Sequence, residues 1–182
     1  KVNYAKKNRL IHGLKNLTIV TPSQWLADIV AESYLKDYPI KLINNGVNLD
    51  VFKPVADESF IKSLGIDLSK KVILGVANIW TKRKGLAEFE KMAKRMTSDW
   101  QILLVGLSAQ QMVNLPENIQ GITRTQNVKQ LAALYNLADV FVNPTYVDNF
   151  PTTNIEALAC GTPIITYHTG GSSEAVDRET GV

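Results

Sequence analysis

With 182 residues, of which 45% are hydrophobic and 20% charged, the chain has the composition of an ordinary globular protein with a sizeable core. Its formal net charge of +3 suits anionic small molecules or a membrane surface and is too weak to predict nucleic acid binding. The single cysteine, Cys160, excludes an internal disulfide and a cysteine-rich metal cluster, which favours a cytoplasmic location. No apolar run approaches the length that spans a membrane.

The first fifty residues predict two helices and two short strands. Residues 1–16 carry basic side chains and no acidic one, which indicates a helix with a solvated basic face. Short apolar runs at 17–20 and 40–43 are typical of strands. Between them we expect a helix capped by Thr21, with Pro22 at its first position and Gln24 completing a capping box.

From residue 57 onward, helical and strand patterns alternate, as in proteins with a parallel sheet. The expected helices cover 57–64, 86–96 and 128–137, and the expected strands cover 72–77, 100–106 and 118–121. Lys82, Arg83 and Lys84 form a basic cluster between a strand end and a helix start. Such a cluster is well placed to bind a phosphate, and a solvated charged loop is the alternative.

The stretch 140–166 predicts one complete strand–helix–strand unit. A buried strand at 140–142 stops at Asn143-Pro144, a helix over 153–160 is closed by Gly161, and a second buried strand covers 164–166. The long polar loop between the first strand and the helix lies beyond the strand ends. Open α/β sheets bind their ligands in the crevice at that place.

Two carboxylates, Asp148 and Glu156, frame this polar loop. The helix start after Pro151 presents backbone N–H groups that suit an anion such as a diphosphate. The carboxylates suit neutral hydroxyls, as on ribose or a hexose, so the combination fits a nucleotide sugar. Glu156 has a second interpretation, because Thr153-x-x-Glu156 is also a capping box in which Glu156 only reaches back to a backbone N–H.

Three linked motifs carry a family resemblance. They are Asp148-x7-Glu156, Ala157-Leu-Ala159-Cys-Gly161-Thr-Pro163-Ile164 and Gly170-Gly171-Ser-Ser-Glu174. Together they resemble the signature of the family-four retaining glycosyltransferases with the GT-B fold, which reads Glu-x7-Glu, Ala-x-Ala-x-Gly-x-Pro-Val and Gly-Gly-x-x-Glu. Asp148 stands where the family has Glu. The segment 45–54, with Asn45-Gly46-Val47 and Phe52-Lys53-Pro54, is similar to the family's link between its two domains.

The resemblance implies an α/β fold, a Rossmann-like and mostly parallel sheet wound by helices, as in the C-terminal half of a GT-B enzyme. Residues 1–52 would be the tail of the N-terminal acceptor domain plus the linker. Residues 53–182 would be the C-terminal nucleotide-sugar-binding domain, truncated at its end. We therefore expect a piece of a longer enzyme that binds a nucleotide sugar weakly and transfers nothing by itself.

The resemblance also implies the reaction: transfer of a hexosyl unit from a nucleoside diphosphate sugar to an acceptor hydroxyl, with retention of anomeric configuration. No metal and no other cofactor would take part, since the nucleotide sugar is a substrate. The acceptor would be a glycan or lipid-linked, in polysaccharide or glycoconjugate synthesis. A peripheral membrane association through the N-terminal domain is left open, and these motifs specify neither the sugar nor the base.

The family's roles are carried over to matching positions. Lys84 would bind the diphosphate, Asp148 the sugar hydroxyls and Glu156 the ribose. The other donor-binding candidates are Arg83, Arg124, Asn149, Phe150, Pro151, Thr152, Gly170 and Gly171. The family's additional diphosphate-binding Arg falls on Asn78, and Arg83 or Lys82 could substitute for it.

Two other functions remain open from the sequence. A nucleotide-sugar epimerase or hydrolase of the same fold would bind its donor similarly, and a non-catalytic nucleotide-binding module would share the crevice. A dinucleotide oxidoreductase is disfavoured, because no predicted strand leads into Gly-x-Gly-x-x-Gly.

Overall fold

The structure, a computed structural model, describes residues 2–55 and 57–182, which divide into two compact units. Unit 1 is Lys1–Asn45 and unit 2 is Gly46–Val182. The division falls at the start of the segment 45–54 that was expected to link two domains. The assignment of residues 1–52 to an acceptor domain stays a prediction.

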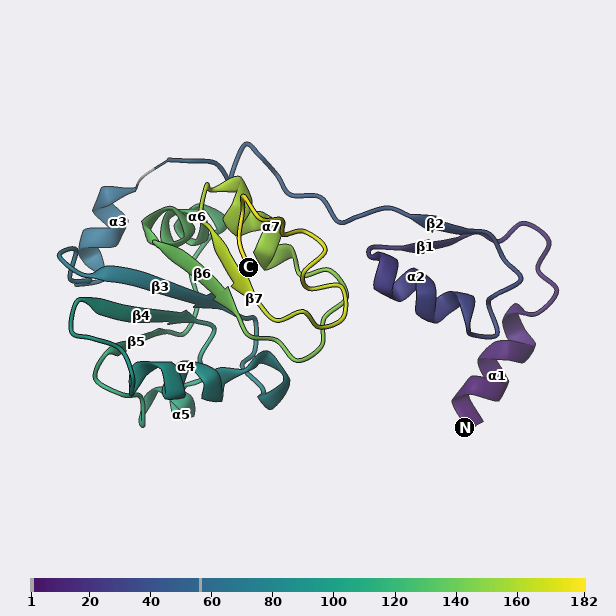
Figure 1. The fold of residues 1–182 in the computed structure, drawn as a ribbon, viewed down its shortest axis with the longest axis horizontal. Helices are drawn as coiled ribbons and strands as arrows, with labels where there is room; N and C mark the ends of the chain where they lie inside the picture. Colours follow the sequence, from purple (N-terminus) through teal and green to yellow (C-terminus); the bar gives the residue numbers. More distant parts are fainter. Residues whose placement is uncertain (1, 56) are drawn as a thin grey trace. The chain divides into compact units, whose positions relative to one another are not determined.

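Unit 1 contains two helices and a two-stranded parallel sheet (Figure 1). Its elements are α1 (Val2–Ile11), β1 (Ile19–Thr21), α2 (Gln24–Ala31) and β2 (Ile40–Leu42). The expectation that Thr21 caps α2 is wrong: the N-cap is Ser23, whose side chain accepts a hydrogen bond from the Leu26 N–H. The carbonyl of Thr21 instead accepts from the Ile43 N–H, so parallel strand pairing keeps this residue in β1.

Unit 2 is built on a five-stranded parallel sheet in the order β5-β4-β3-β6-β7 (Figure 1). The strands are β3 (Lys71–Val76), β4 (Trp100–Val105), β5 (Ile119–Ile122), β6 (Val140–Asn143) and β7 (Ile164–Thr166). Leu74 of β3 aligns with Leu103 of β4 on one side and with Phe141 of β6 on the other. The predicted α/β class and the parallel sheet are thereby confirmed.

Helices cover both faces of this sheet (Figure 1). They are α3 (Glu58–Ser63), α4 (Leu86–Ala93), α5 (Ala109–Met112), α6 (Val128–Leu137) and α7 (Thr152–Ala159), with a 3₁₀ helix η1 (Lys82–Lys84). The cluster that buries Ile61, Leu134 and Ala157 joins α3, α6 and α7 to one face. The cluster that buries Phe89 and Ala93 joins α4 to the other face. The sheet is therefore doubly wound, with an apolar layer on each side.

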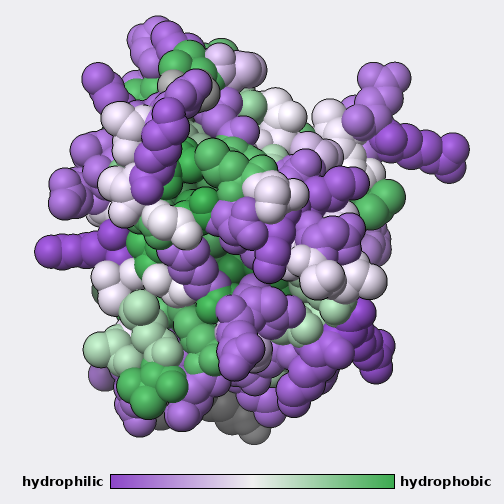
Figure 2. Space-filling model, turned by 90° about the vertical axis from the view of Figure 1, so that its left-hand side faces the viewer, coloured by the Kyte–Doolittle hydropathy of each residue, from purple (hydrophilic) through white to green (hydrophobic). Residues whose placement is uncertain are grey.

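The strand order places a topological switch between β3 and β6. After β3 the chain proceeds outward to β4 and β5, and it then returns to the other side of β3 to form β6. The connections that leave the carboxyl ends of β3 and β6 therefore diverge, which opens a crevice between them. The opposite end of unit 2, where the strands begin, faces the viewer in Figure 2 and is mainly hydrophilic, with hydrophobic side chains along its middle.

Buried polar side chains tie β6, α7 and β7 together beside this crevice. The Asn143 amide donates to Asn154 Oδ1 at 2.8 Å, and the Asn154 amide donates to the Ser172 carbonyl at 2.8 Å. The Thr166 hydroxyl donates to the Asn143 carbonyl at 2.9 Å and lies 2.8 Å from Ser172 Oγ. We call these four residues the asparagine network. Its members are buried, so their bonds operate where water does not compete.

Replacing Asn154 by Ala should destabilise unit 2. The change removes two buried hydrogen bonds and leaves the Ser172 carbonyl and the Asn143 amide without these partners. We expect a loss of about 2–4 kcal/mol of unfolding free energy, measured by urea denaturation. The matched control is Asn149→Ala at an exposed position, which should change stability by less than about 0.5 kcal/mol. Equal midpoints for the two variants would contradict the structural role of the network.

Candidate functional site

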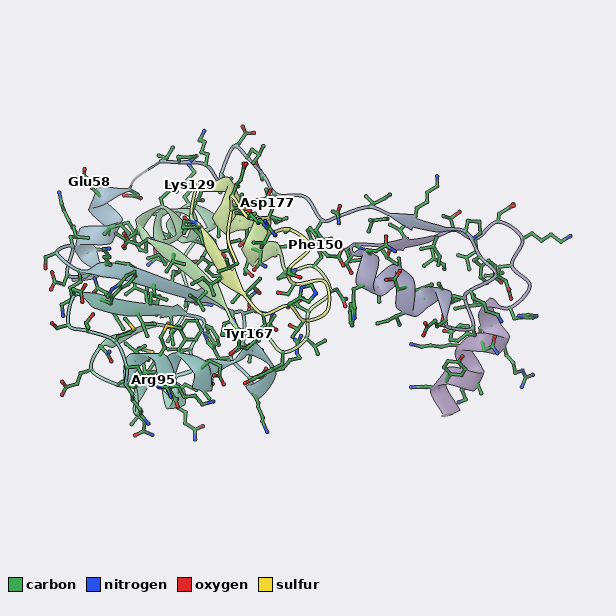
Figure 3. The ribbon with its side chains drawn as sticks, viewed as in Figure 1. Glu58, Arg95, Lys129, Phe150, Tyr167 and Asp177 are labelled. Atoms are coloured by element: carbon green, nitrogen blue, oxygen red, sulfur yellow. The ribbon has the colours of Figure 1, made fainter. Side chains whose placement is uncertain are left out.

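Two adjoining cavities lie at the carboxyl ends of the strands of unit 2. The lysine cavity, of about 600 Å³, is lined by the end of β3, by Arg83 and Lys84, by Asp148 and by residues 150–153. The glutamate cavity, of about 290 Å³, is lined by the ends of β3 and β4, by residues 123–125 and by Glu156. Both share Val76, Ala77, Asn78 and Thr153, so they form one continuous crevice. Figure 3 labels Phe150, which lies at this end of the sheet.

An ion pair forms part of the lining of the lysine cavity. Lys84 Nζ lies 2.6 Å from Asp148 Oδ2, and the two side chains are only 22% and 19% exposed. The other carboxylate oxygen, Oδ1, accepts from the Asn149 N–H at 2.9 Å. Both oxygens of Asp148 are therefore engaged within the protein. A ligand would meet Lys84 and Asp148 as a pair, through the ammonium donors and carboxylate lone pairs that these contacts leave over.

The backbone explains how Lys84 reaches Asp148. Gly85 ends η1 with φ = 76°, a left-handed conformation that favours glycine. A Cβ at Gly85 would overlap the carbonyl oxygen of Pro144, so the chain can pass this close to the loop after β6 only without a side chain. The alternative of a solvated charged loop holds for Lys82 and Arg83, which are exposed, but is wrong for Lys84.

Arg83 connects the two loops that flank the lysine cavity. Its Nη1 donates to the Val147 carbonyl at 2.7 Å, and its own carbonyl accepts from the Tyr146 N–H at 2.9 Å. The guanidinium is thus used to hold the loop after β6. Asn78, at the position of the family's additional Arg, lines both cavities with a neutral side chain.

The glycine pair lies behind the Asp148 loop. The Gly171 N–H donates to the Asp148 carbonyl at 2.9 Å. Gly170 has φ = 58°, and a Cβ there would overlap the same carbonyl oxygen. The Thr169 hydroxyl also donates to the Thr145 carbonyl at 2.7 Å. The structure therefore places Gly170 and Gly171 as a support for the Asp148 backbone, outside the lining of the two cavities.

Glu156 lies half-buried on α7, and Arg124 lies with it in the lining of the glutamate cavity. Glu156 Oε2 accepts a hydrogen bond from the Tyr135 hydroxyl at 3.0 Å. The capping-box alternative is wrong: the N-cap of α7 is Pro151, without a side-chain cap, and Thr153 lies inside the helix. Burial raises the pKa of Glu156, and hydrogen bonds from Tyr135 and Thr152 partly offset the rise in that pKa.

Tyr135 is a contact of the site that the sequence did not indicate. Tyr135 lies in a predicted helix with an apolar face, so the sequence predicts only a buried aromatic side chain. Its hydrogen-bond partner, Glu156, lies on another helix, and no local pattern links the two residues. A buried tyrosine hydroxyl usually has a hydrogen-bond partner, and this rule alone would have predicted that Tyr135 contacts a polar group. Burial, followed by the charge of Glu156, raises the pKa of Tyr135 well above its ordinary value.

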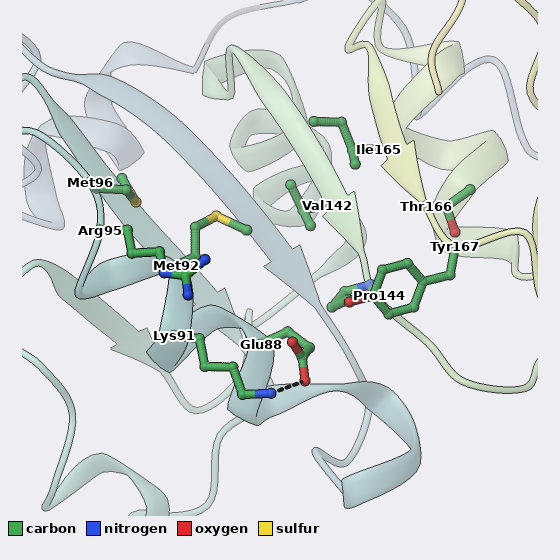
Figure 4. Close-up of a pocket in the computed structure, with 10 residues that line it drawn as sticks. All are labelled: Glu88, Lys91, Met92, Arg95, Met96, Val142, Pro144, Ile165, Thr166 and Tyr167. Atoms are coloured by element: carbon green, nitrogen blue, oxygen red, sulfur yellow. Dashed lines mark hydrogen bonds and ion pairs between the residues drawn. The ribbon is translucent and has the colours of Figure 1, made fainter.

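A third hollow, of about 510 Å³, lies on the face of the sheet that carries α4 (Figure 4). Met92, Val142 and Ile165 contribute apolar surface there, and Glu88 pairs with Lys91 at 2.9 Å. None of the residues that the sequence predicted for the site lines this hollow. The candidate site is therefore the crevice at the strand ends.

Among the described residues, 2–55 and 57–182, no group of three or more His, Cys, Asp or Glu side chains is arranged to hold a metal ion. No helix in this part of the chain combines the length and the apolar character needed to cross a membrane.

The chain is similar to proteins that are named as synthases and glycosyltransferases. Alpha-maltose-1-phosphate synthase of Mycolicibacterium smegmatis is 26% identical over 183 residues, which cover 90% of this chain and 47% of that protein. The structure of sucrose-phosphate synthase from Thermosynechococcus elongatus matches with a TM-score of 0.81 at 25% identity, covering 100% of this chain and 48% of that one. The chain spans about half the length of the curated relatives that it matches.

The structure of Anabaena HepE in complex with UDP-glucose shares the fold, with a TM-score of 0.75 at 19% identity over 97% of this chain and 51% of that one. The family model described as glycosyl transferases group 1 matches residues 70–182, which hold the whole sheet from β3 onward and both cavities. This chain belongs to the group 1 family of glycosyl transferases.

Proposed function

We propose that unit 2 binds a nucleoside diphosphate sugar in the crevice. The whole enzyme would transfer the hexosyl unit to an acceptor hydroxyl with retention of anomeric configuration, without a metal ion or other cofactor. The observation that carries this proposal is the Lys84–Asp148 ion pair beside the start of α7, next to a cavity that contains Glu156. A cation and a helix start suit a diphosphate, and carboxylates on either side suit sugar hydroxyls.

The lysine cavity would take the diphosphate and the hexose. Transfer breaks the bond between the anomeric carbon and the β-phosphate oxygen, which leaves negative charge on the diphosphate. Lys84 and the N–H groups at Thr152 and Thr153 are placed to stabilise that charge as it develops. When Lys84 turns to the phosphate, Asp148 is released to accept hydrogen bonds from the hexose hydroxyls.

The glutamate cavity would take the nucleoside. Glu156 provides an acceptor for the ribose hydroxyls, and residues 123–125, which follow β5, would flank the base. HepE, whose structure contains UDP-glucose, shares this fold, so UDP and UDP-glucose are the first probes to test.

The acceptor would be a glycan or a lipid-linked molecule bound by the N-terminal domain, in polysaccharide or glycoconjugate synthesis. Such an enzyme would work in the cytoplasm, with a peripheral membrane association where its acceptor is lipid-linked. The relatives named as synthases and glycosyltransferases support the transferase class.

Lys84→Ala should weaken the binding of UDP by about tenfold or more, since a charge-assisted hydrogen bond contributes about 1.5–3 kcal/mol. Calorimetric titration of the 182-residue chain measures this. Lys82→Ala is the matched control, because Lys82 is an exposed cation in the same 3₁₀ helix and does not line the lysine cavity. If both variants bind UDP like the unsubstituted chain, Lys84 does not contact the diphosphate.

Asp148→Asn should separate diphosphate recognition from sugar recognition. The change frees Lys84 from its ion pair, so UDP should bind equally well or up to roughly fivefold more tightly, for a pair worth about 1 kcal/mol. UDP-glucose should lose affinity relative to UDP, because the hexose loses its carboxylate acceptor. The ratio of the two dissociation constants is the measurement. If UDP and UDP-glucose lose affinity to the same extent, Asp148 acts only by supporting the fold.

Glu156→Gln should stabilise the fold at neutral pH and weaken UDP binding. The raised pKa of Glu156 means that the folded state favours the protonated carboxyl, so the ionised form destabilises the protein above that pKa. At pH 7 the melting temperature of the variant should lie a few degrees above that of the unsubstituted chain. For a chain of this size, each kcal/mol of unfolding free energy changes the melting temperature by about 2–4 °C. The difference should shrink as the pH falls through the folded pKa and vanish below 4.5, where the carboxyl is protonated in both the folded and the unfolded state. A pH-independent difference in melting temperature would contradict this origin.

A further inference from the structure

The ring of Tyr135 is fully buried, at 0% exposure, between α6 and the sheet. Its hydroxyl crosses to α7 and donates to Glu156 Oε2 at 3.0 Å. Glu156 is half-buried and also lines the glutamate cavity, so this bond connects the core to the surface of the crevice.

The position of the ring is determined from several sides. Phe52 contacts it edge-on with ring centroids 6.1 Å apart, and Phe141 of β6 does so at 5.4 Å. With the ring held edge-on by these two aromatic side chains, the hydroxyl is directed at a single place.

Packing alone does not explain a tyrosine here. A phenylalanine would fill the same space without a buried hydroxyl, and burying a hydroxyl is unfavourable unless it is hydrogen-bonded. What the hydroxyl adds is one directed donor to a carboxylate. That donor selects one orientation of a flexible glutamate side chain and leaves the remaining acceptor sites of the carboxylate for a ligand.

We propose that Tyr135 is a positioning residue for nucleotide recognition: its hydroxyl orients Glu156 so that the carboxylate meets the ribose hydroxyls of a nucleoside diphosphate. This inference rests on the proposed function. The same hydrogen bond stabilises the ionised carboxylate against burial, because it opposes the desolvation that raises the Glu156 pKa.

The test compares Tyr135→Phe with the unsubstituted chain by calorimetric titration with UDP, 2′-deoxy-UDP and 3′-deoxy-UDP. The unsubstituted chain should prefer UDP to at least one deoxy form by about tenfold, the effect of one charge-assisted hydrogen bond. Tyr135→Phe should lose about threefold to tenfold in UDP affinity and less than about twofold for that deoxy form. The discrimination between the ribose and the deoxyribose ligand should therefore shrink.

Thr162→Val is the matched control. It removes a buried hydrogen bond to the Tyr135 backbone and leaves the Tyr135 hydroxyl in place. It should lower the melting temperature while the preference for UDP over the deoxy form stays as in the unsubstituted chain. If Tyr135→Phe does not unfold cooperatively, Phe52→Leu applies the same test, because it removes an edge-on contact that holds the Tyr135 ring and leaves the hydroxyl and Glu156 unchanged. The preference for UDP over the deoxy form should then shrink as well, and a full preference would contradict the positioning role.

The outcomes separate the two proposals. If UDP, GDP and ADP all fail to bind the unsubstituted chain, the proposed function is overturned and the role of Tyr135 with it. If UDP binds and Tyr135→Phe keeps the full preference over the deoxy forms, the proposed function stands and Tyr135 is only a core residue. A reduced preference in Tyr135→Phe but not in Thr162→Val supports the positioning role.

Discussion

The buried asparagine network fixes the geometry on which the candidate site depends. It joins the carboxyl ends of β6 and β7 to the first turn of α7 and to Ser172 in the following loop. The start of α7 sets the place of Glu156, and the loop after β7 brings Gly171 against the carbonyl of Asp148. Because each hydrogen bond of the network joins two different segments, a shift of one segment would unpair a buried polar group in another.

Both cations that line the lysine cavity are hydrogen-bonded within the protein. The cations that line the lysine cavity are Arg83 and Lys84, and both have partners in the described structure: the Val147 carbonyl and the Asp148 carboxylate. Under the proposed function, a diphosphate would take up or share Lys84 with Asp148, and the hydroxyl donors of a hexose would compensate Asp148. The ion pair would then couple recognition of the two halves of a nucleotide sugar.

Much of the fold follows from patterns that are local in the sequence. The apolar runs at 72–77 and 140–142 become β3 and β6, and α6 covers the expected 128–137, because burial on both faces of a parallel sheet leaves little choice of residue. The cap of α2 was misassigned, since the bond between Thr21 and Ile43 depends on strand pairing. The short helix α5 was not expected at all.

The site was predictable as a set of residues but not as a set of contacts. The motifs indicated Lys84, Asp148 and Glu156, whereas the Lys84–Asp148 pair joins residues 64 positions apart and the Tyr135–Glu156 pair joins two helices. The periodicity of apolar residues is a local pattern and does not predict such long-range contacts. They arise from the strand order, which brings η1 beside the loop after β6 and α6 beside α7.

The resemblance to the family puts Asn78 where a diphosphate-binding Arg is expected, so cations for the lysine cavity would have to come from other positions. Asn78 lines both cavities and contributes hydrogen-bonding groups but no charge. The cations that line the lysine cavity are Arg83, which holds the loop after β6 through the Val147 carbonyl, and Lys84, which is paired with Asp148. Aspartate stands at position 148 where the resemblance expects glutamate, and its carboxylate lies 2.6 Å from Lys84. One departure removes a cation from the lining of the lysine cavity and the other lies in its ion pair, so both bear on how the crevice would hold an anion.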